Sequence, residues 1–172
     1  MNEKFFDLKK EKQDRMINAS LKVFAMNGYA HASTDDIVRE AGISKGLLFH
    51  YFVSKLGLYS FIYDYSIRYV ILELTTGVDK EETDYFRLVG QIREAELQVM
   101  RNYPCMMLFL NNSRLENVSE VLLETEDKRN ILSEKYAQIL SQATGEELDE
   151  RLSREQLSEM IRFTTEGLMR RH

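Results

Sequence analysis

The apolar residues of the chain recur at intervals of three and four positions over most of its length, the spacing of a buried helix face. No stretch of useful length alternates between apolar and polar residues as a half-buried strand would. The pattern therefore predicts an all-α protein. Long helices are expected at 9–27, 58–76, 84–102 and 120–142, with a final helix from Ser153 and loops near 77–82, 103–104, 116–118 and 144–152.

Residues 33–52, which we call the reader, are expected to form two short helices around a turn. Ser33 has the character of a helix N-cap, and Asp36 stands three residues later, where a capping box places its acid. Gly42 supplies the backbone freedom of a tight helix exit, and Ser44 can cap the second helix. Two helices this short have no interior of their own, so other segments must support them.

The second helix of the reader has two unlike faces. At about 100° per residue, Leu48 and Phe52 point to one side. The opposite side carries no acidic residue, and the helix begins with Lys45 at an N-terminus that already favours anions. Such a face is unusual for a solvated helix and suits a helix laid against DNA. The other members of this face are Gly46, Leu47, His50 and Tyr51.

Helices on both sides of the reader are expected to support it. The helix at 9–27 stops at Gly28 and braces the reader from the N-terminal side. After the reader, Ser54 caps a helix rich in aromatic residues that Gly77 ends. This helix is apolar on more than one side, as expected of an element that is buried by the reader and by the rest of the chain.

The segment from about Met16 to Lys55 resembles the DNA-binding domain of the TetR family of transcriptional regulators. The match covers roughly a quarter of the chain and is specific in order and spacing. The remainder resembles the family in being helical and of suitable length. The matching residues are Ile17, Ala19, Phe24, Gly28, Tyr29, Thr34, Ile37, Ala41, Gly42, Ile43, Ser44, Lys45, Gly46, Leu48, Tyr51, Phe52 and Lys55.

The resemblance implies an N-terminal three-helix bundle with a helix-turn-helix at 1–54, followed by a larger helical ligand-binding and dimerisation domain at 55–172, which we call the body. TetR-like proteins are mostly homodimeric repressors that bind a pseudo-palindromic operator in double-stranded DNA and respond to a small-molecule effector. Their chains commonly continue to a further helix that completes the dimer interface. This sequence stops at His172 without a helix-end signal, so a truncated body is one expectation.

The charge of the chain permits DNA binding without predicting it. The net charge is −5, which by itself argues against a nucleic-acid partner. Residues 1–60, however, hold nine Lys or Arg against seven Asp or Glu, whereas 61–172 hold fourteen against twenty-one. The basic groups are thus concentrated toward the reader, and the acidic remainder is consistent with a regulatory body.

The sequence predicts a soluble, cytoplasmic protein with no membrane partner. Charged residues interrupt the apolar pair near the N-terminus, so no signal peptide is expected. The longest uncharged run, 102–113, is too short to span a bilayer. Cys105 is the single cysteine, which excludes an intramolecular disulfide and any cysteine-based zinc cluster within one chain. We expect it to be a small buried hydrophobe, with a redox role as the less favoured alternative.

An enzymatic function is not expected, and we assign no catalytic residues, metal ligands or cofactors. His31, His50 and His172 are scattered, and no HExxH pair is present. The glycines do not form a phosphate-binding loop. The carboxylates lie on helix faces beside Lys and Arg, where a solvated or paired role is the default.

The expected DNA contacts follow from chemistry and from the resemblance. Backbone phosphates are expected at Thr34, Ser44, His50, Tyr51 and Lys55. Lys45 can reach a guanine edge or a phosphate, Gly46 allows close approach, and Leu47 is suited to a thymine methyl group.

Each of these residues also has a purely structural interpretation, as a cap, a packing residue or a tolerated glycine. The residues favour DNA jointly, because packing does not explain an acid-free, Gly-bearing face opposite Leu48 and Phe52. The family generally has a Tyr at position 49, and Phe49 lacks the hydroxyl that would reach the DNA backbone. Relatives usually carry an acid soon after Lys55, and Leu56 with Gly57 here predicts a weaker helix start and a less secure Lys55.

An apolar effector pocket is the second predicted site. Ordinary core packing is the favoured alternative for its residues, because Met and aromatic side chains at helical spacing usually pack against one another. The principal hypothesis is a repressor released by a small apolar or aromatic ligand. A ligand-independent architectural DNA-binding factor and a helical protein–protein adaptor are the alternatives. The candidate pocket residues are Tyr63, Tyr69, Phe86, Met100, Tyr103, Met107 and Phe109.

Overall fold

The fold is described by a computed structural model that covers residues 3–144, 156 and 159. Every regular element in this described part is a helix, which confirms the all-α prediction. The elements are η1 (Glu3–Phe5), α1 (Lys10–His31), α2 (Thr34–Ala41), α3 (Lys45–Phe52), α4 (Lys55–Gly77), α5 (Tyr85–Asn102), α6 (Met106–Ser113), α7 (Ser119–Thr125), η2 (Glu126–Lys128) and α8 (Ile131–Leu140).

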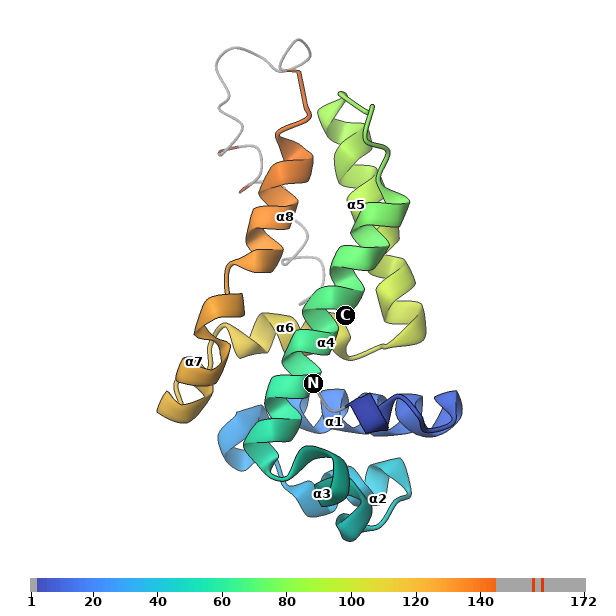
Figure 1. Ribbon diagram of the computed structural model, residues 1–172. Coiled ribbons are helices and arrows are strands. Elements are labelled where there is room, and N and C mark those ends of the chain that lie inside the picture. The colour runs from blue at the N-terminus through green and yellow to red at the C-terminus, as the bar shows by residue number, and fades with distance from the viewer. Residues whose placement is uncertain (1–2, 145–155, 157–158, 160–172) are drawn as a thin grey trace.

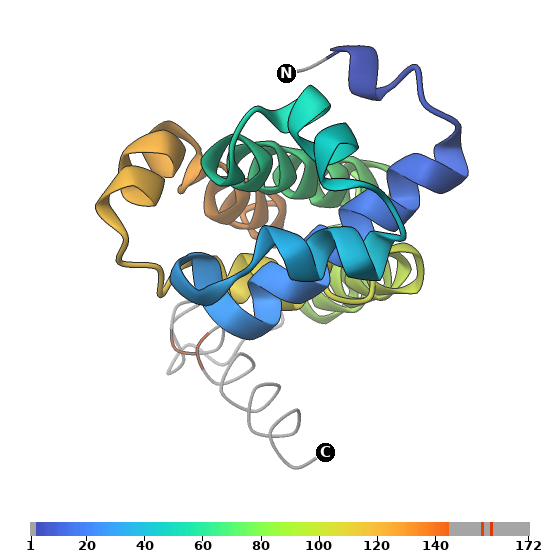
Figure 2. The ribbon, with the colours of Figure 1, turned by 90° about the horizontal axis from the view of Figure 1, so that it is seen from below.

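The reader lies at one end of the molecule. In Figure 1, α2 and α3 are below α1, and α4 rises from them into the body. Helix α5 returns beside α4, α6 packs along α1, and α8 runs beside α4 on its other side. Seen from below, in Figure 2, α2 and α3 face the viewer with nothing in front of them. The described part of the body therefore leaves the outer face of the reader uncovered.

The N-terminal helix ends its regular course at Gly28, as predicted. Gly28 has φ 65° and ψ 173°, which is outside the helical region and in the range that favours glycine. One further turn, Tyr29 to His31, follows this break before Ala32 adopts an extended conformation. We call this feature the α1 break.

Helix α4 has the predicted Ser54 cap and the predicted Gly77 end, and it begins at Lys55, three residues before the expected range 58–76. The Ser54 hydroxyl accepts a hydrogen bond from the Gly57 N–H at 3.0 Å, and Gly77 is the last helical residue. Leu58, Tyr59, Phe61, Ile62 and Tyr63 are all buried, so α4 is covered on several sides. Helix α4 contacts α3 of the reader and α5, α7 and α8 of the body.

The prediction of one helix from Glu120 to Gln142 is wrong. The chain forms α7, the short η2 and then α8, with the interruption at residues 126–130. Glu126, Asp127 and Arg129 are exposed there. A charged run of this length has no apolar stripe to bury, so packing does not hold a continuous helix through it. The final helix expected from Ser153 lies outside the described residues, except that Gln156 and Glu159 are helical.

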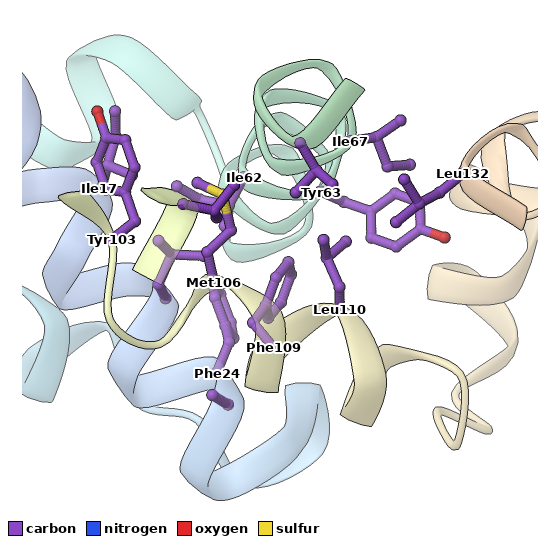
Figure 3. Close-up of a cluster of buried hydrophobic side chains, with 14 of the residues drawn as sticks. Ile17, Phe24, Ile62, Tyr63, Ile67, Tyr103, Met106, Phe109, Leu110 and Leu132 are labelled. Carbon is purple, nitrogen blue, oxygen red and sulfur yellow. The ribbon is translucent and has the colours of Figure 1, made fainter. Parts of the chain in front are cut away.

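One apolar core runs through both predicted domains. Phe24 of α1, Tyr59 of α4 and Phe109 of α6 meet with ring centroids 5.0 Å (Phe24 to Tyr59) and 5.3 Å (Tyr59 to Phe109) apart. Figure 3 shows Phe24, Phe109 and Tyr63 within this cluster. Burial of these rings removes water between the reader's brace and the body, and edge-to-face pairs add about 0.5–1.5 kcal/mol each. Helix α1, which braces the reader, therefore packs directly against the body.

Buried tyrosines give the fold a dependence on alkaline pH. Burial raises the pKa of Tyr59, Tyr103 and Tyr136 above the ordinary value of 10.0. Above about pH 10 the unfolded chain loses these protons while the folded chain keeps them. We therefore expect the free energy of unfolding to be constant with respect to these groups below that pH and to fall as the pH rises further.

Denaturation with urea at successive alkaline pH values measures this effect, and phenolate absorbance of the folded protein reports the ionisation. A Tyr103→Phe variant should lose part of the pH dependence. Ordinary titration of all nine tyrosines in the folded protein would contradict the packing described here.

Candidate DNA-binding site

The turn of the reader forms as predicted. The Ser33 hydroxyl accepts from the Asp35 N–H at 3.1 Å, and Gly42 is left-handed with φ 63° and ψ 43°. The Ile43 N–H donates to the Val38 carbonyl at 3.0 Å, which closes the helix end. These contacts fix the direction in which the chain leaves α2.

The reciprocal half of the predicted capping box is replaced by another contact. Asp36 accepts a hydrogen bond from the Arg39 guanidinium on the next turn of α2. Asp36 is thus engaged in an i, i+3 ion pair on an exposed helix surface. Ser33 remains the cap of α2.

Helix α3 has the predicted buried side and an open side, but Tyr51, which the sequence placed on the open side, packs against the core. The Ser44 hydroxyl caps it by accepting from the Leu47 N–H at 3.2 Å. Leu48 and Phe52 are 1% and 5% exposed and pack into the core. Lys45, Gly46 and His50 are exposed, and Leu47, Phe49 and Tyr51 are half-buried. The helix contains no acidic residue, so its outer face can approach a polyanion without like-charge repulsion.

An aromatic cluster packs against α3 on its buried side. Phe5 of η1 is fully buried, with ring centroids 5.3 Å from Phe52, 5.9 Å from Tyr51 and 5.0 Å from Phe61. The periodic pattern of the sequence does not indicate this role of Phe5. The apolar pair of Phe5 and Phe6 in a charged lead-in was the available signal, and its partners lie about 50 residues away.

Lys45 forms an exposed ion pair within the reader. Its Nζ lies 2.9 Å from Asp35 Oδ1 on α2. Both side chains are more than half exposed, and an exposed pair of this kind contributes little because water and salt screen it. The ammonium can therefore exchange this partner for a phosphate or a base edge.

Lys55 is held more firmly than the sequence predicted. Its Nζ donates to the Ala32 carbonyl at 3.1 Å and to the Ala30 carbonyl at 3.5 Å, and it lies 4.4 Å from the centroid of the Tyr29 ring. These contacts tie the start of α4 to the connection between α1 and α2. A contact between Lys55 and DNA stays a prediction.

Thr34 and His50 lie on different helices of the reader, α2 and α3. Thr34 is half-buried in the first turn of α2. His50 is exposed and packs edge-on against Tyr51, with ring centroids 4.9 Å apart. Six of the eight predicted contact residues therefore lie in α2 and α3, Ser44 is the N-cap of α3, and Lys55 is the first residue of α4.

Val53 follows α3 in an unfavourable backbone conformation. Its φ is 59° and its ψ is −45°, and its side chain is 83% exposed. A β-branched residue at positive φ is strained by roughly 1–3 kcal/mol. The strain sits in the short connection that fixes the end of α3 against the start of α4.

The seven candidate pocket residues have different surroundings. Tyr69 and Tyr103 are in edge-to-face contact at 4.9 Å, and Tyr63 lies 6.4 Å from Phe109. Tyr63, Tyr103 and Phe109 are core residues. Met100 and Met107 are half-buried, whereas Phe86 is 57% exposed.

A small cavity of about 240 Å³ lies elsewhere, between the end of α3, α4 and the α7–η2 segment. Its walls are polar as well as aromatic. The Ser60 hydroxyl donates to Glu124 Oε1 at 2.8 Å, and Lys128 Nζ lies 3.8 Å from Asp64 Oδ1. None of the seven candidates lines it. The lining residues are Tyr51, Phe52, Gly57, Ser60, Phe61, Asp64, Glu124 and Lys128.

Within the described part of the chain, no group of three or more His, Cys, Asp or Glu side chains is placed to hold a metal ion. Cys105 is a free, half-buried thiol. The described helices include none with the length and apolar character that crossing a bilayer requires.

The geometry of the reader defines the class of this domain. Two short helices meet at a left-handed glycine, and the second is buried on one side and open and free of acid on the other, which is a helix-turn-helix of the DNA-binding kind. Residues 16–60 match the sequence profile of the bacterial regulatory proteins, tetR family. This N-terminal segment is therefore similar to the DNA-binding domain of tetR family regulators.

Three relatives, all called uncharacterised HTH-type transcriptional regulators, share part of the sequence. YuxN of Bacillus subtilis is 38% identical over 93 residues, which are 52% of this chain and 32% of YuxN. YerO of the same organism is 42% identical over 48 residues, covering 28% of this chain and 17% of YerO. TtgW of Pseudomonas putida is 40% identical over 47 residues, covering 27% of this chain and 35% of TtgW. The matches thus span about a third of each relative or less.

Two solved structures share the fold. PfmR, a TetR family transcriptional regulator from Thermus thermophilus, superposes with a TM-score of 0.56 at 21% identity, over 81% of this chain and 75% of PfmR. A tetR family transcription regulator from a Shewanella species gives 0.50 at 22% identity, over 77% of this chain and 65% of that regulator. At these identities the likeness shows a shared fold.

Proposed function

We propose that the protein is a sequence-specific DNA-binding transcriptional regulator. The observation that carries the proposal is the outer face of α3, which is exposed, contains a glycine and lacks acid, opposite the buried Leu48 and Phe52. A recognition helix needs such a face to enter the major groove. The regulator would act in the cytoplasm, where its DNA is.

The proposed contacts divide between backbone and bases. Ser44 and the first-turn N–H groups of α3 bind one phosphate, and Thr34 binds another. Lys45 leaves its exposed partner Asp35 for a guanine edge or a phosphate. Leu47 contacts a thymine methyl group, since its side chain offers no hydrogen bond.

The remaining contacts orient the reader on the duplex. His50 and Tyr51 bind phosphates at the end of α3, where their rings already contact each other. Lys55 extends this row while its bonds to Ala30 and Ala32 hold the reader to α4. Gly46 allows the α3 backbone to approach the base edges closely.

We further propose a division at 1–54 and 55–172, with the body serving dimerisation and effector binding. Two readers of a homodimer would occupy successive major grooves of a pseudo-palindromic operator. A small apolar or aromatic effector that favours a different separation of the readers would release the repressor from DNA. The apolar core that joins α1, α4 and α6 supports mechanical coupling of this kind.

Selection from fragmented genomic DNA, followed by footprinting of the retained fragments at several salt concentrations, tests the proposal. A regulator should protect two half-sites separated by about one helical turn or a multiple of it. Its affinity should fall steeply as salt rises, because bound phosphates release counterions. Retention without a footprint, or affinity that does not respond to salt, would favour a protein–protein adaptor.

Gly46→Ala should separate stability from DNA binding. An added Cβ at Gly46 meets no other group within 4 Å, so alanine should stabilise α3 by about 0.5–1 kcal/mol. If α3 enters the groove by this face, the same methyl group should weaken operator binding by roughly tenfold or more. Thermal denaturation and titration of labelled operator DNA measure the two effects.

Gly90→Ala is the matched control. Gly90 is an exposed glycine of α5, and its added Cβ also meets no other group within 4 Å. It should give a similar gain in stability and leave operator affinity unchanged. Equal operator affinity in both variants would show that the Gly46 face does not approach DNA.

A further inference from the structure

The α1 break leaves two backbone groups without the hydrogen bond that they would form with each other in a straight helix. In an uninterrupted helix, the Tyr29 N–H donates to the Ala25 carbonyl four residues earlier. Gly28 lies between them in a non-helical conformation. Ala25 and Tyr29 are both buried, so leaving their polar groups without partners would be costly.

Two side chains of the body supply partners for these groups. Glu116 Oε2 accepts from the Tyr29 N–H at 2.9 Å. Asn112 Nδ2 donates to the Ala25 carbonyl at 2.8 Å. Both come from the end of α6 and the connection that follows it, about 87 residues away along the chain. We call this pair of residues the α1 clip.

Glu116 is itself fixed within the body. Its other oxygen, Oε1, accepts from the N–H groups of Asn117 at 3.2 Å and Val118 at 3.4 Å, immediately before α7 begins. The carboxylate therefore bridges the start of α7 and the α1 break. A movement of the α6–α7 connection would therefore displace or break the hydrogen bond between Glu116 and the Tyr29 N–H.

Tyr29 passes this constraint on toward the reader. Its ring packs edge-on against Tyr59, with centroids 5.4 Å apart, and carries the Lys55 ammonium at 4.4 Å. Lys55 in turn donates to the carbonyl of Ala32, the residue before the Ser33 cap of α2. A continuous series of contacts thus leads from Glu116 to Ala32, the residue immediately before the reader.

We propose that Asn112 and Glu116 are positioning residues for DNA binding: they set the orientation of the reader through the α1 break, and the α6–α7 connection transmits body conformation to it. For its DNA readout the inference rests on the proposed function. The inference also predicts an effect that can be measured without DNA, because the α1 clip should stabilise the structure of α1 and α2.

Amide hydrogen exchange of the full chain tests the clip by itself. Glu116→Ala removes the acceptor of the Tyr29 N–H, so this amide should exchange roughly tenfold faster or more. Amides of α2, such as that of Ile37, should also exchange faster because the reader loses its anchor. Glu116→Gln retains a carbonyl acceptor and should recover part of the protection at Tyr29. Faster exchange at Tyr29 with unchanged exchange in α2 would overturn the transmission to the reader.

Operator titration tests the functional part of the inference. Glu116→Ala and Asn112→Asp should each weaken binding by roughly three- to tenfold, and the double variant should lose less than the product of the two because both act through one break. The measurements are made well below the unfolding transition of each variant.

Glu126→Ala and Asn111→Asp are matched controls, since each makes the same chemical change at an exposed position of the same region. The operator affinity of each control should equal that of the wild type, once the small effect of its changed net charge on DNA affinity is subtracted. If the wild type binds its operator and the clip variants bind it equally well, the inference fails. If the wild type binds no DNA, the proposed function fails, and the exchange rates in α2 still decide whether the clip holds the reader.

Discussion

Replacing Phe109 by alanine should lower the free energy of unfolding by about 3–5 kcal/mol, the usual cost of removing a buried aromatic side chain. Phe109 is 1% exposed. Its ring centroid lies 5.3 Å from Tyr59, 6.3 Å from Phe24 and 6.4 Å from Tyr63, so the deletion would leave a cavity where α1, α4 and α6 meet. Urea denaturation followed by circular dichroism measures the change.

Phe86→Ala is the matched control for this prediction. Both phenylalanines were candidates for an effector pocket, yet Phe86 is 57% exposed on α5. Its removal should cost less than about 1 kcal/mol. A loss at Phe109 no larger than that at Phe86 would mean that the junction of α1, α4 and α6 is not tightly packed.

The second large effect is expected at Gly57, where even alanine should destabilise the protein by about 2–3 kcal/mol. An added Cβ would overlap the Phe52 carbonyl oxygen, far inside van der Waals contact. That oxygen cannot move away easily, since it accepts from the Ser54 N–H at 2.5 Å while the Ser54 hydroxyl accepts from Gly57. Relief of the clash would displace the end of α3, so operator affinity should also fall.

Gly90→Ala is again the control. The helix preference of alanine should stabilise α5 at Gly90, whereas at Gly57 the clash with the Phe52 carbonyl oxygen outweighs that preference. Denaturation midpoints of the two variants should therefore move in opposite directions from the wild type. A stabilising Gly57→Ala would show that the α3–α4 turn can relax without cost.

The surroundings of Gly57 depend on packing that the residue pattern does not contain. From the pattern, Gly57 was expected to weaken the start of α4 and to leave Lys55 loosely placed. The structure shows that the position has no room for a side chain and that Lys55 is held by Ala30, Ala32 and the Tyr29 ring. The partners of Lys55 lie more than 20 residues earlier in the chain, and no local pattern records them.

Local signals predicted the helix boundaries well. Ser33, Ser44 and Ser54 cap α2, α3 and α4, and Gly42 turns the chain at a left-handed conformation. Caps and turns depend on atoms within about four residues, so the sequence contains the whole interaction. The prediction of one helix at 120–142 failed because it relied on apolar periodicity alone. That periodicity is interrupted by a charged run that has no buried face.

By itself, the sequence determined the all-α class, the helix-turn-helix at 33–52 and the acid-free outer face of its second helix, because each depends on spacing and residue type within a few turns. Tertiary structure alone decided that Phe109 is core, that Phe5 supports α3 and that Glu116 and Asn112 complete the α1 break. These outcomes depend on which distant side chains meet after the helices have packed. Periodicity fixes the face that a helix buries, whereas only the packed chain selects the partners on that face.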